Sequence, residues 1–180
     1  MINIVCFMGG TCGDLVTAMI DSTDVTLTNG SIDFPFTRMQ LKKPHTFASD
    51  NEKDLVIQSS EYRSISSHDY DYHLRKEHKI LSVGIDNTAA ATWSAVRFKN
   101  LHKPHIWKEM SIRCGATTIE EYAQMYIDFT SMVRTNPNAT VISINDILTG
   151  NLLNTLSELG IETDSNAPAL YNAWIETNKL

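Results

Sequence analysis

Side chains and backbone groups suited to chemistry gather in two stretches of this 180-residue sequence, a glycine-rich turn at 9–14 and a polar stretch at 66–73. The turn, Gly9-Gly10-Thr11-Cys12-Gly13-Asp14, follows an apolar run over residues 2–8 that predicts a buried strand. It precedes an apolar stretch over 15–20 that can continue as a helix. A strand, a glycine turn and a helix direct several backbone N–H groups, and the positive end of the helix, at one point. That geometry holds phosphate or sulfate.

The turn departs from the two common nucleotide-binding patterns. No lysine lies between residues 1 and 41, so G-x-x-x-x-G-K-[ST] is absent, and so is the spacing G-x-G-x-x-G. Thr11 offers a hydroxyl donor, whereas Asp14 helps cap the helix but repels an anion. Cys12, at a helix N-terminus, is expected to have a lowered thiol pKa, but the C-x₅-R pattern of a cysteine phosphatase fails at Ala18. An anion site is the favoured interpretation, and a tight connection whose glycines serve sterics alone is the alternative.

The second stretch, Ser67-His68-Asp69-Tyr70-Asp71-Tyr72-His73, concentrates groups that titrate near neutral pH or form hydrogen bonds. We take His68 as a candidate general base, because it would stand at the carboxyl end of a strand, where parallel sheets place their sites. A surface loop with His68 hydrogen-bonded to the backbone is the alternative. The two histidines and two aspartates of this stretch could also bind a metal ion, but they would have to converge on it from a strand edge and a loop. We predict no metal.

Alternating strand and helix patterns surround these stretches. Further strands are predicted at 54–60, 79–85 and 140–144, and further helices at 88–101, 118–134, 152–160 and 167–177, with Thr117 or Thr118 as an N-cap. Residues 23–45 are less regular, with turn signals at Asn29-Gly30 and Phe34-Pro35, and Lys103-Pro104 breaks a helix. The order predicts one α/β domain over residues 1–180, in three layers, with a mostly parallel sheet and helices on both faces.

Composition excludes several classes of protein. The net charge of -6 disfavours non-specific binding of nucleic acid. No apolar run is long enough for a transmembrane helix, and the first ten residues carry no basic signal-peptide region, so we expect no membrane partner. Three cysteines at unrelated spacings (Cys6, Cys12, Cys114) make neither a disulfide framework nor a zinc pattern. We therefore expect a soluble, cytoplasmic protein.

Taken in order, these segments resemble a short sulfotransferase of the P-loop type. That family opens with a strand and a loop of the K-[ST]-G-[ST]-[ST] kind, which residues 9–15 match in position. Ile65-Ser66-Ser67-His68 is similar to its strand ending in Thr-His or Ser-His. The segment 79–87, followed by Ser94 and Arg97, resembles the strand and helix that hold a 3′-phosphate. Residues 141–161 look like its last strand and helix, and the whole is similar to short sulfotransferase-like proteins encoded by marine cyanophages.

The resemblance implies a P-loop NTPase/sulfotransferase-like fold and a small anionic or nucleotide ligand, the sulfuryl donor PAPS or its product PAP. It implies transfer of a sulfuryl group to a hydroxyl acceptor, with His68 as the catalytic base and Ser94 and Arg97 on the 3′-phosphate. The residues that it implies around the 5′-phosphosulfate are Gly9, Gly10, Thr11, Cys12, Gly13 and Asp14. If the chain is phage-encoded, its location is the host cytoplasm.

Two expected cations are missing from this pattern. Gly9 or Gly10 stands in place of the loop lysine that balances charge on the transferring group, and Ile85 stands in place of the arginine before Asp86. The alternative function is therefore a catalytically degenerate scaffold that acts as a binding or virion/host-interaction protein. A nucleoside monophosphate kinase is disfavoured, because no P-loop lysine is present.

Overall fold

The structure is a computed structural model that describes residues 2–22, 25–29, 37–41, 49–58, 62–101 and 104–178. The described strands are β1 (Asn3–Cys6), β2 (Val25–Asn29), β3 (Thr37–Leu41), β4 (Ser64–Ser67), β5 (Ile80–Gly84) and β6 (Ala139–Ser143). The described helices are α1 (Gly13–Ile20), α2 (Asp50–Gln58), α3 (Tyr70–Arg75), α4 (Thr88–Leu101), α5 (Pro104–Cys114), α6 (Ile119–Arg134), α7 (Ile144–Leu148), α8 (Leu152–Glu158) and α9 (Ala167–Asn178). The turn signals at Gly30 and 34–35, and Lys103 before Pro104, lie outside the described residues.

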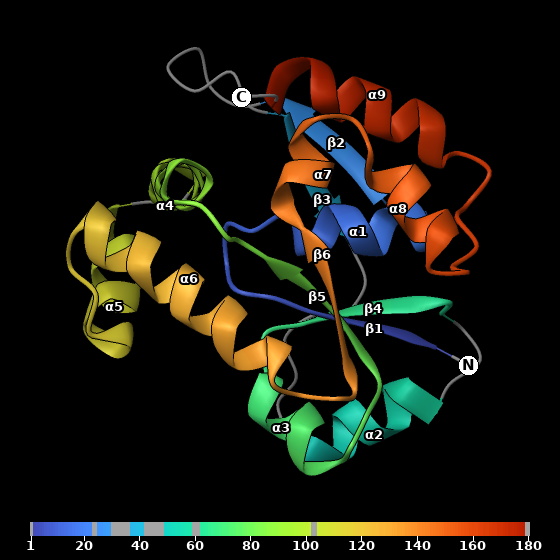
Figure 1. The fold of residues 1–180 in the computed structure, drawn as a ribbon, viewed down its shortest axis with the longest axis horizontal. Helices are drawn as coiled ribbons and strands as arrows, with labels where there is room; N and C mark the ends of the chain where they lie inside the picture. Colours follow the sequence, from blue (N-terminus) through green and yellow to red (C-terminus); the bar gives the residue numbers. More distant parts are fainter. Residues whose placement is uncertain are drawn as a thin grey trace.

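A four-stranded parallel sheet with the order β4-β1-β5-β6 forms the centre of the described structure (Figure 1). In register, Cys6 of β1 pairs with Ser67 of β4 on one side and with Ser82 of β5 on the other. The carboxyl ends of these strands therefore meet at one edge of the sheet, which is where α/β proteins place their ligands. The expectation of an α/β fold with a parallel sheet between helices is confirmed.

The two faces of the sheet pack against different sets of helices, with α6 contributing to both. Val5, Val83 and Ile142 belong to the larger core, which includes residues of α1, α4 and α6 to α9. Ile4 and Ile65 face the other way and pack with residues of α2, α3 and α6. Figure 1 shows α1 and α9 on one side of the strands and α2 and α3 on the other. Alternate side chains of one strand thus pack into the cores on opposite faces, as expected for a sheet covered by helices on both faces.

The segment predicted as a strand at 54–60 is a helix as far as the structure describes it, because α2 runs to Gln58. The backbone N–H of Glu52 donates to the hydroxyl of Ser49, 3.3 Å away, and Lys53 pairs with Asp50 at 3.1 Å one turn earlier. The apolar run that suggested a strand is only three residues long, and its first residue, Leu55, is 71% exposed. Local capping and an i, i+3 ion pair therefore outweigh a weak strand pattern.

Residues 23–45, expected to be irregular, contain the antiparallel strands β2 and β3, paired from Val25 with Leu41 to Asn29 with Thr37. They form a separate two-stranded sheet, and β3 lies against α1 and α9. Pro104 ends one helix as predicted, but it also begins α5, because proline is tolerated in the first turn of a helix.

The prediction of a capped helix start at Thr118 is confirmed. Its hydroxyl accepts a hydrogen bond from the N–H of Glu121 at 3.2 Å, and the Glu121 carboxylate accepts one from the Thr118 N–H at 3.0 Å. This capping box fixes the start of α6, the longest described helix. No helix in the described part of the chain is long and apolar enough to cross a membrane.

Candidate functional site

His68 stands where β4 ends, beside the end of β1. The N–H of Phe7 donates to the Ser67 carbonyl at 3.1 Å. This hydrogen bond keeps the backbone that follows β1 beside the end of β4. The Nδ1 of His68 lies 2.8 Å from the carbonyl oxygen of Phe7, and the two rings meet edge to face at 4.5 Å. Because a carbonyl only accepts, Nδ1 carries the proton, and the lone pair of the neutral ring lies on Nε2. The exposed imidazole thus has the tautomer that a base needs.

The glycine turn is held by hydrogen bonds within itself and by α6. Thr11 donates both its N–H, at 3.2 Å, and its hydroxyl, at 2.7 Å, to the carbonyl of Met8. Tyr126 of α6 donates its hydroxyl to the carbonyl of Gly9 at 2.7 Å. Gly10 has a φ of 93°, a left-handed conformation that glycine adopts without strain. The hydroxyl of Thr11, which the sequence offered as a ligand donor, is therefore engaged inside the turn.

The glycines of the turn are also required by packing. A Cβ on Gly9 would stand 2.6 Å from the Phe98 ring, one on Gly10 would stand 2.9 Å from the Ser94 carbonyl oxygen, and one on Gly13 would stand 1.9 Å from the Phe7 ring. These overlaps account for the three glycines without any ligand, as the steric alternative supposed. They also leave no room at Gly9 or Gly10 for the lysine of the family pattern.

Gly13→Ala is expected to lower the free energy of unfolding by about 2–3 kcal/mol, because overpacking forces a ring to move in a filled core. Phe7 is 4% exposed and its ring contacts His68, so it cannot swing aside without breaking that contact. Urea unfolding measures the loss. The matched control is Gly150→Ala, since Gly150 has a φ of 88° and open space around it. Gly150→Ala thus measures the cost of backbone strain without overlap, whereas Gly13 has no positive φ; a loss below about 1 kcal/mol in Gly13→Ala would contradict the overlap with Phe7.

Arg97 brings a positive charge into the core beside this turn. Its side chain lies on α4, is only 7% exposed, and its guanidinium lies 5.7 Å from the Trp93 ring and 5.9 Å from the Trp174 ring. Its Nε is buried and has no hydrogen-bond partner, and no carboxylate of the described residues pairs with it. Buried charges in proteins are normally paired, so this guanidinium is a candidate group for binding an anion, although Asp14 also has a buried oxygen without a partner.

The N-terminus of α1 lies close to this guanidinium. Cys12 is the N-cap residue, in the left-handed region with a φ of 66°, and no side chain caps the helix. Burial raises the pKa of the Cys12 thiol, the positive charge of Arg97 opposes that rise, and Asp14 adds to it. The lowered pKa expected from the sequence is therefore wrong, because burial outweighs the helix end. The charges of Arg97 and Asp14 both act on the Cys12 thiol at the start of α1.

Ser94 lies one turn before Arg97 on α4, and its hydroxyl is also buried without a partner. Its carbonyl faces Gly10, so α4 and the turn are in direct contact. We name the turn at 9–14 together with His68, Ser94 and Arg97 the carboxyl-edge site. The sequence singled out all of these residues. The fold brings the turn next to Ser94 and Arg97, and it places His68 beside Phe7 at the start of the turn.

Other candidate residues are placed elsewhere. Asp71 is exposed, whereas His73 is 1% exposed and its Nε2 lies 2.8 Å from the Ser67 hydroxyl. Within the described ranges no group of three or more histidines, cysteines or acids could hold a metal ion. Asp86 forms an ion pair with Arg134 at 2.6 Å, and Ile85 is 1% exposed. Neither residue supplies the positive charge that the resemblance expects before Asp86.

A second polar cluster, which the sequence did not predict, lies behind His68. The Nε2 of His73 lies 2.8 Å from the Ser67 hydroxyl, and its Nδ1 lies 3.1 Å from the Nδ1 of His78. Lys53 of α2 forms an ion pair with Asp69, the N-cap of α3, and lies 4.4 Å above the Tyr72 ring. The helix pattern that follows Asp69 was the available signal, but its partner Lys53 lies just before the segment predicted as a strand, and nothing in the sequence joined the two.

Comparison with known proteins gives no family for this chain. No protein-family model matches it, and no curated protein matches it. The chemistry of the carboxyl-edge site therefore carries the functional argument.

Proposed function

We propose that the protein binds a small ligand bearing phosphate or sulfate at the carboxyl-edge site. The observation that carries this proposal is the buried guanidinium of Arg97, whose Nε has no partner, beside the uncapped N-terminus of α1. An anion there gains charge-assisted hydrogen bonds from Arg97 and a favourable interaction with the positive end of the helix. The hydroxyl of Ser94 is a further donor. The carboxylate of Asp14 opposes the anion, which Arg97 must outweigh.

We further propose sulfuryl transfer from PAPS to a hydroxyl acceptor as the reaction at this site. His68 takes the acceptor's proton on Nε2, the acceptor oxygen forms a bond to sulfur, and the bond from sulfur to the phosphate oxygen breaks, which leaves PAP. The hydrogen bond from His68 to the Phe7 carbonyl supports this role, because it keeps the basic lone pair on Nε2. Ser94 and Arg97 would bind the 3′-phosphate of the donor.

A second candidate function is binding without catalysis, as in a virion or host-interaction protein. It is favoured by the filled space around Gly9 and Gly10, where Phe98 and Ser94 exclude a lysine side chain. Without that cation, charge developing on a transferring sulfuryl group is less well stabilised. The two candidates share the anion site and differ in turnover.

A thermal-shift titration with sulfate, PAP, PAPS and ATP tests the proposal. A ligand at 100 times its Kd should stabilise the protein by about 2.7 kcal/mol, which is several degrees in Tm. PAP and PAPS should shift the Tm more than sulfate does. No shift with any of these anions at about 1 mM, the range of weak specific binding, would overturn the anion site.

His68→Ala should lower the rate of sulfuryl transfer by about 10²- to 10⁴-fold, the usual contribution of a general base, and leave the affinity for PAP unchanged. Transfer from labelled PAPS to a panel of hydroxyl compounds measures the rate. His105→Ala, at an exposed position on α5, is the matched control and should retain full activity. Turnover that survives in His68→Ala would remove His68 from the mechanism. PAP binding without turnover in the parent protein would select the binding function.

A further inference from the structure

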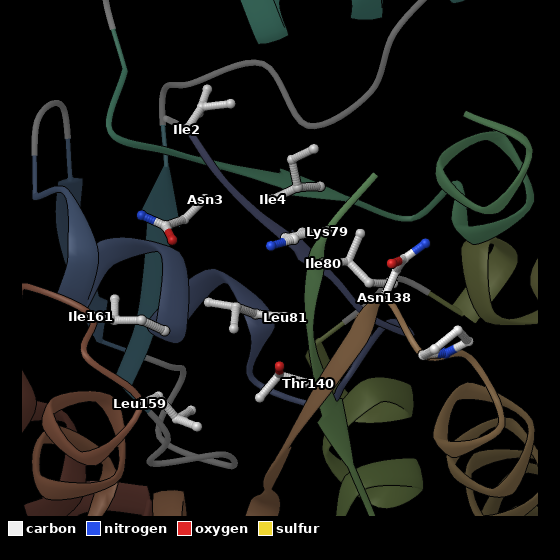
Figure 2. Close-up of a pocket in the computed structure, with 11 residues that line it drawn as sticks. Ile2, Asn3, Ile4, Lys79, Ile80, Leu81, Asn138, Thr140, Leu159 and Ile161 are labelled. Atoms are coloured by element: carbon white, nitrogen blue, oxygen red, sulfur yellow. The ribbon is translucent and has the colours of Figure 1, made fainter. Parts of the chain in front are cut away.

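A cavity of about 380 Å³ opens at the opposite edge of the sheet, where the strands begin (Figure 2). It lies at the amino ends of β1, β5 and β6 and beneath the segment that follows α8. Its apolar lining residues are Ile2, Ile4, Ile80, Leu81, Pro137, Leu159 and Ile161, and its polar ones are Asn3, Lys79, Asn138 and Thr140. We name it the amino-edge pocket. Its volume falls within the range of about 300–1,000 Å³ that small-molecule sites occupy.

Lys79 is the one charged residue that lines this pocket. It is exposed, directly precedes β5 and forms no ion pair with the described carboxylates. In Figure 2 its ammonium group points toward the space bounded by Asn3, Leu81 and Ile161. The pocket therefore combines one cation with mainly apolar walls and contains no carboxylate.

Some of the polar groups around Lys79 are engaged by the protein. The side-chain N–H of Asn3 donates to the carbonyl of Arg63 at 3.2 Å, and the carbonyl of Asn138 accepts from the N–H of Ile80 at 2.9 Å. The side chains of Asn138 and Thr140 are uncharged, so they can add hydrogen bonds but no charge. The ammonium of Lys79 is left as the principal group that can recognise a ligand by charge.

We propose that the amino-edge pocket binds a small amphipathic carboxylate with an apolar chain of about eight to ten carbons, a size suited to a cavity in this range. The carboxylate pairs with Lys79 at the rim, and the chain covers Leu81, Leu159 and Ile161. Leu159 is 43% exposed in the ligand-free protein, so a bound chain would remove apolar surface from water. A single ammonium matches a monoanion better than a phosphate group, which distinguishes this site from the carboxyl-edge site.

Isothermal titration calorimetry with hexanoate, octanoate and decanoate, each below its micelle concentration, tests the proposal. Affinity should rise by about tenfold for each two added methylene groups. Decanol, which keeps the chain, and acetate, which keeps the charge, should each bind at least about tenfold more weakly than decanoate, because the charge-assisted hydrogen bond and the apolar contact act together.

Lys79→Gln should weaken decanoate binding by about tenfold and leave decanol binding unchanged. Lys108→Gln, at an exposed lysine outside the pocket, is the matched control and should bind decanoate as the parent does. Thr140→Trp, at an exposed pocket residue, should block the chain and abolish binding.

Equal affinity for decanoate and decanol, or no saturable heat up to about 1 mM decanoate, would overturn the proposal. Loss of decanoate binding equally in the Lys79 and Lys108 variants would also overturn it. The sulfate and PAP titrations address a different edge of the sheet, so the two proposals succeed or fail independently.

Discussion

Arg97→Met should weaken binding of sulfate and PAP by about 30- to 100-fold without lowering the free energy of unfolding. Removing a charge-assisted, two-pronged contact to an anion costs about 2–3 kcal/mol, which corresponds to that loss of affinity. Methionine is unbranched and apolar, so it fills most of the space between Trp93 and Trp174. The ligand-free protein should gain stability by about 1 kcal/mol, because a buried guanidinium with an unpaired Nε is costly.

A loss of anion affinity together with a gain of stability distinguishes a binding role of Arg97 from a structural one. A residue that holds an anion is retained at the expense of stability, whereas a residue that holds the fold loses stability when it is removed. The contacts of the guanidinium with Trp93 and Trp174, at 5.7 and 5.9 Å, offset part of the burial cost. Urea unfolding in sulfate-free buffer measures the stability, and calorimetric titration with PAP measures the affinity.

Two further variants serve as controls for Arg97→Met. Arg97→Lys keeps the charge but loses the planar fork, so it should recover part of the affinity. Asp14→Asn removes the carboxylate at the end of the turn and should tighten anion binding by several-fold. Arg97→Met that is destabilised by more than about 2 kcal/mol and binds PAP normally would show that the guanidinium has a structural role only.

The protein should lose about 2–3 kcal/mol of stability between pH 7 and pH 4.5, before most of its carboxylates titrate. Burial lowers the pKa of His73 to about 4, with His78 and Lys53 lowering it further and Asp69 opposing them. The unfolded chain takes up a proton near the ordinary value of 6.5, whereas the folded chain resists it. The stabilisation linked to His73 is therefore complete above about pH 7 and is lost as the pH falls toward 4.

The same cluster contains a second histidine that adds to this effect. Burial lowers the pKa of His78, whose Nδ1 faces the Nδ1 of His73 at 3.1 Å, so the pair cannot hold two protons without repulsion. Hydrogen bonds from Tyr72 and Lys76 lower the pKa of Asp54, and the stability linked to that carboxylate is lost only at still lower pH. The loss of stability between pH 7 and pH 4.5 is therefore due mainly to the histidines.

Urea unfolding at half-unit steps of pH measures this loss in the parent protein. His73→Gln, whose side chain does not titrate, should flatten the dependence between pH 7 and pH 4.5, and His105→Gln should leave it unchanged. Constant stability of the parent protein across that range would contradict the inward placement of His73.

Much of the fold was predictable from short stretches of sequence. The apolar run before the glycine turn, the helix after it, the Thr118 capping box and the run over 79–85 each depend on neighbours within a few residues. Capping and periodicity act within one or two turns of chain, so a single sequence reveals them. The strand predicted at 54–60 was wrong for the same reason, since three apolar residues fit a helix as well as a strand.

The sequence predicted which residues form the candidate site, but not which of them are buried. The sequence singled out Ser94 and Arg97 through the resemblance and gave no indication that Arg97 is buried. Only the tertiary structure buries that guanidinium between Trp93 and Trp174, which lie on helices at opposite ends of the chain's second half. The burial turns an ordinary surface arginine into a charge that needs a counter-ion.

By itself, the sequence determined an acidic α/β chain with a strand–glycine turn–helix unit and a histidine at a strand end. The tertiary structure decided which of those residues meet. Phe98 and Phe7 fill the space around the glycines, Tyr126 holds the turn, and His73 turns inward to Ser67. These outcomes depend on contacts between residues far apart in sequence, because burial and the pairing of charge are properties of the packed chain and not of any short stretch within it.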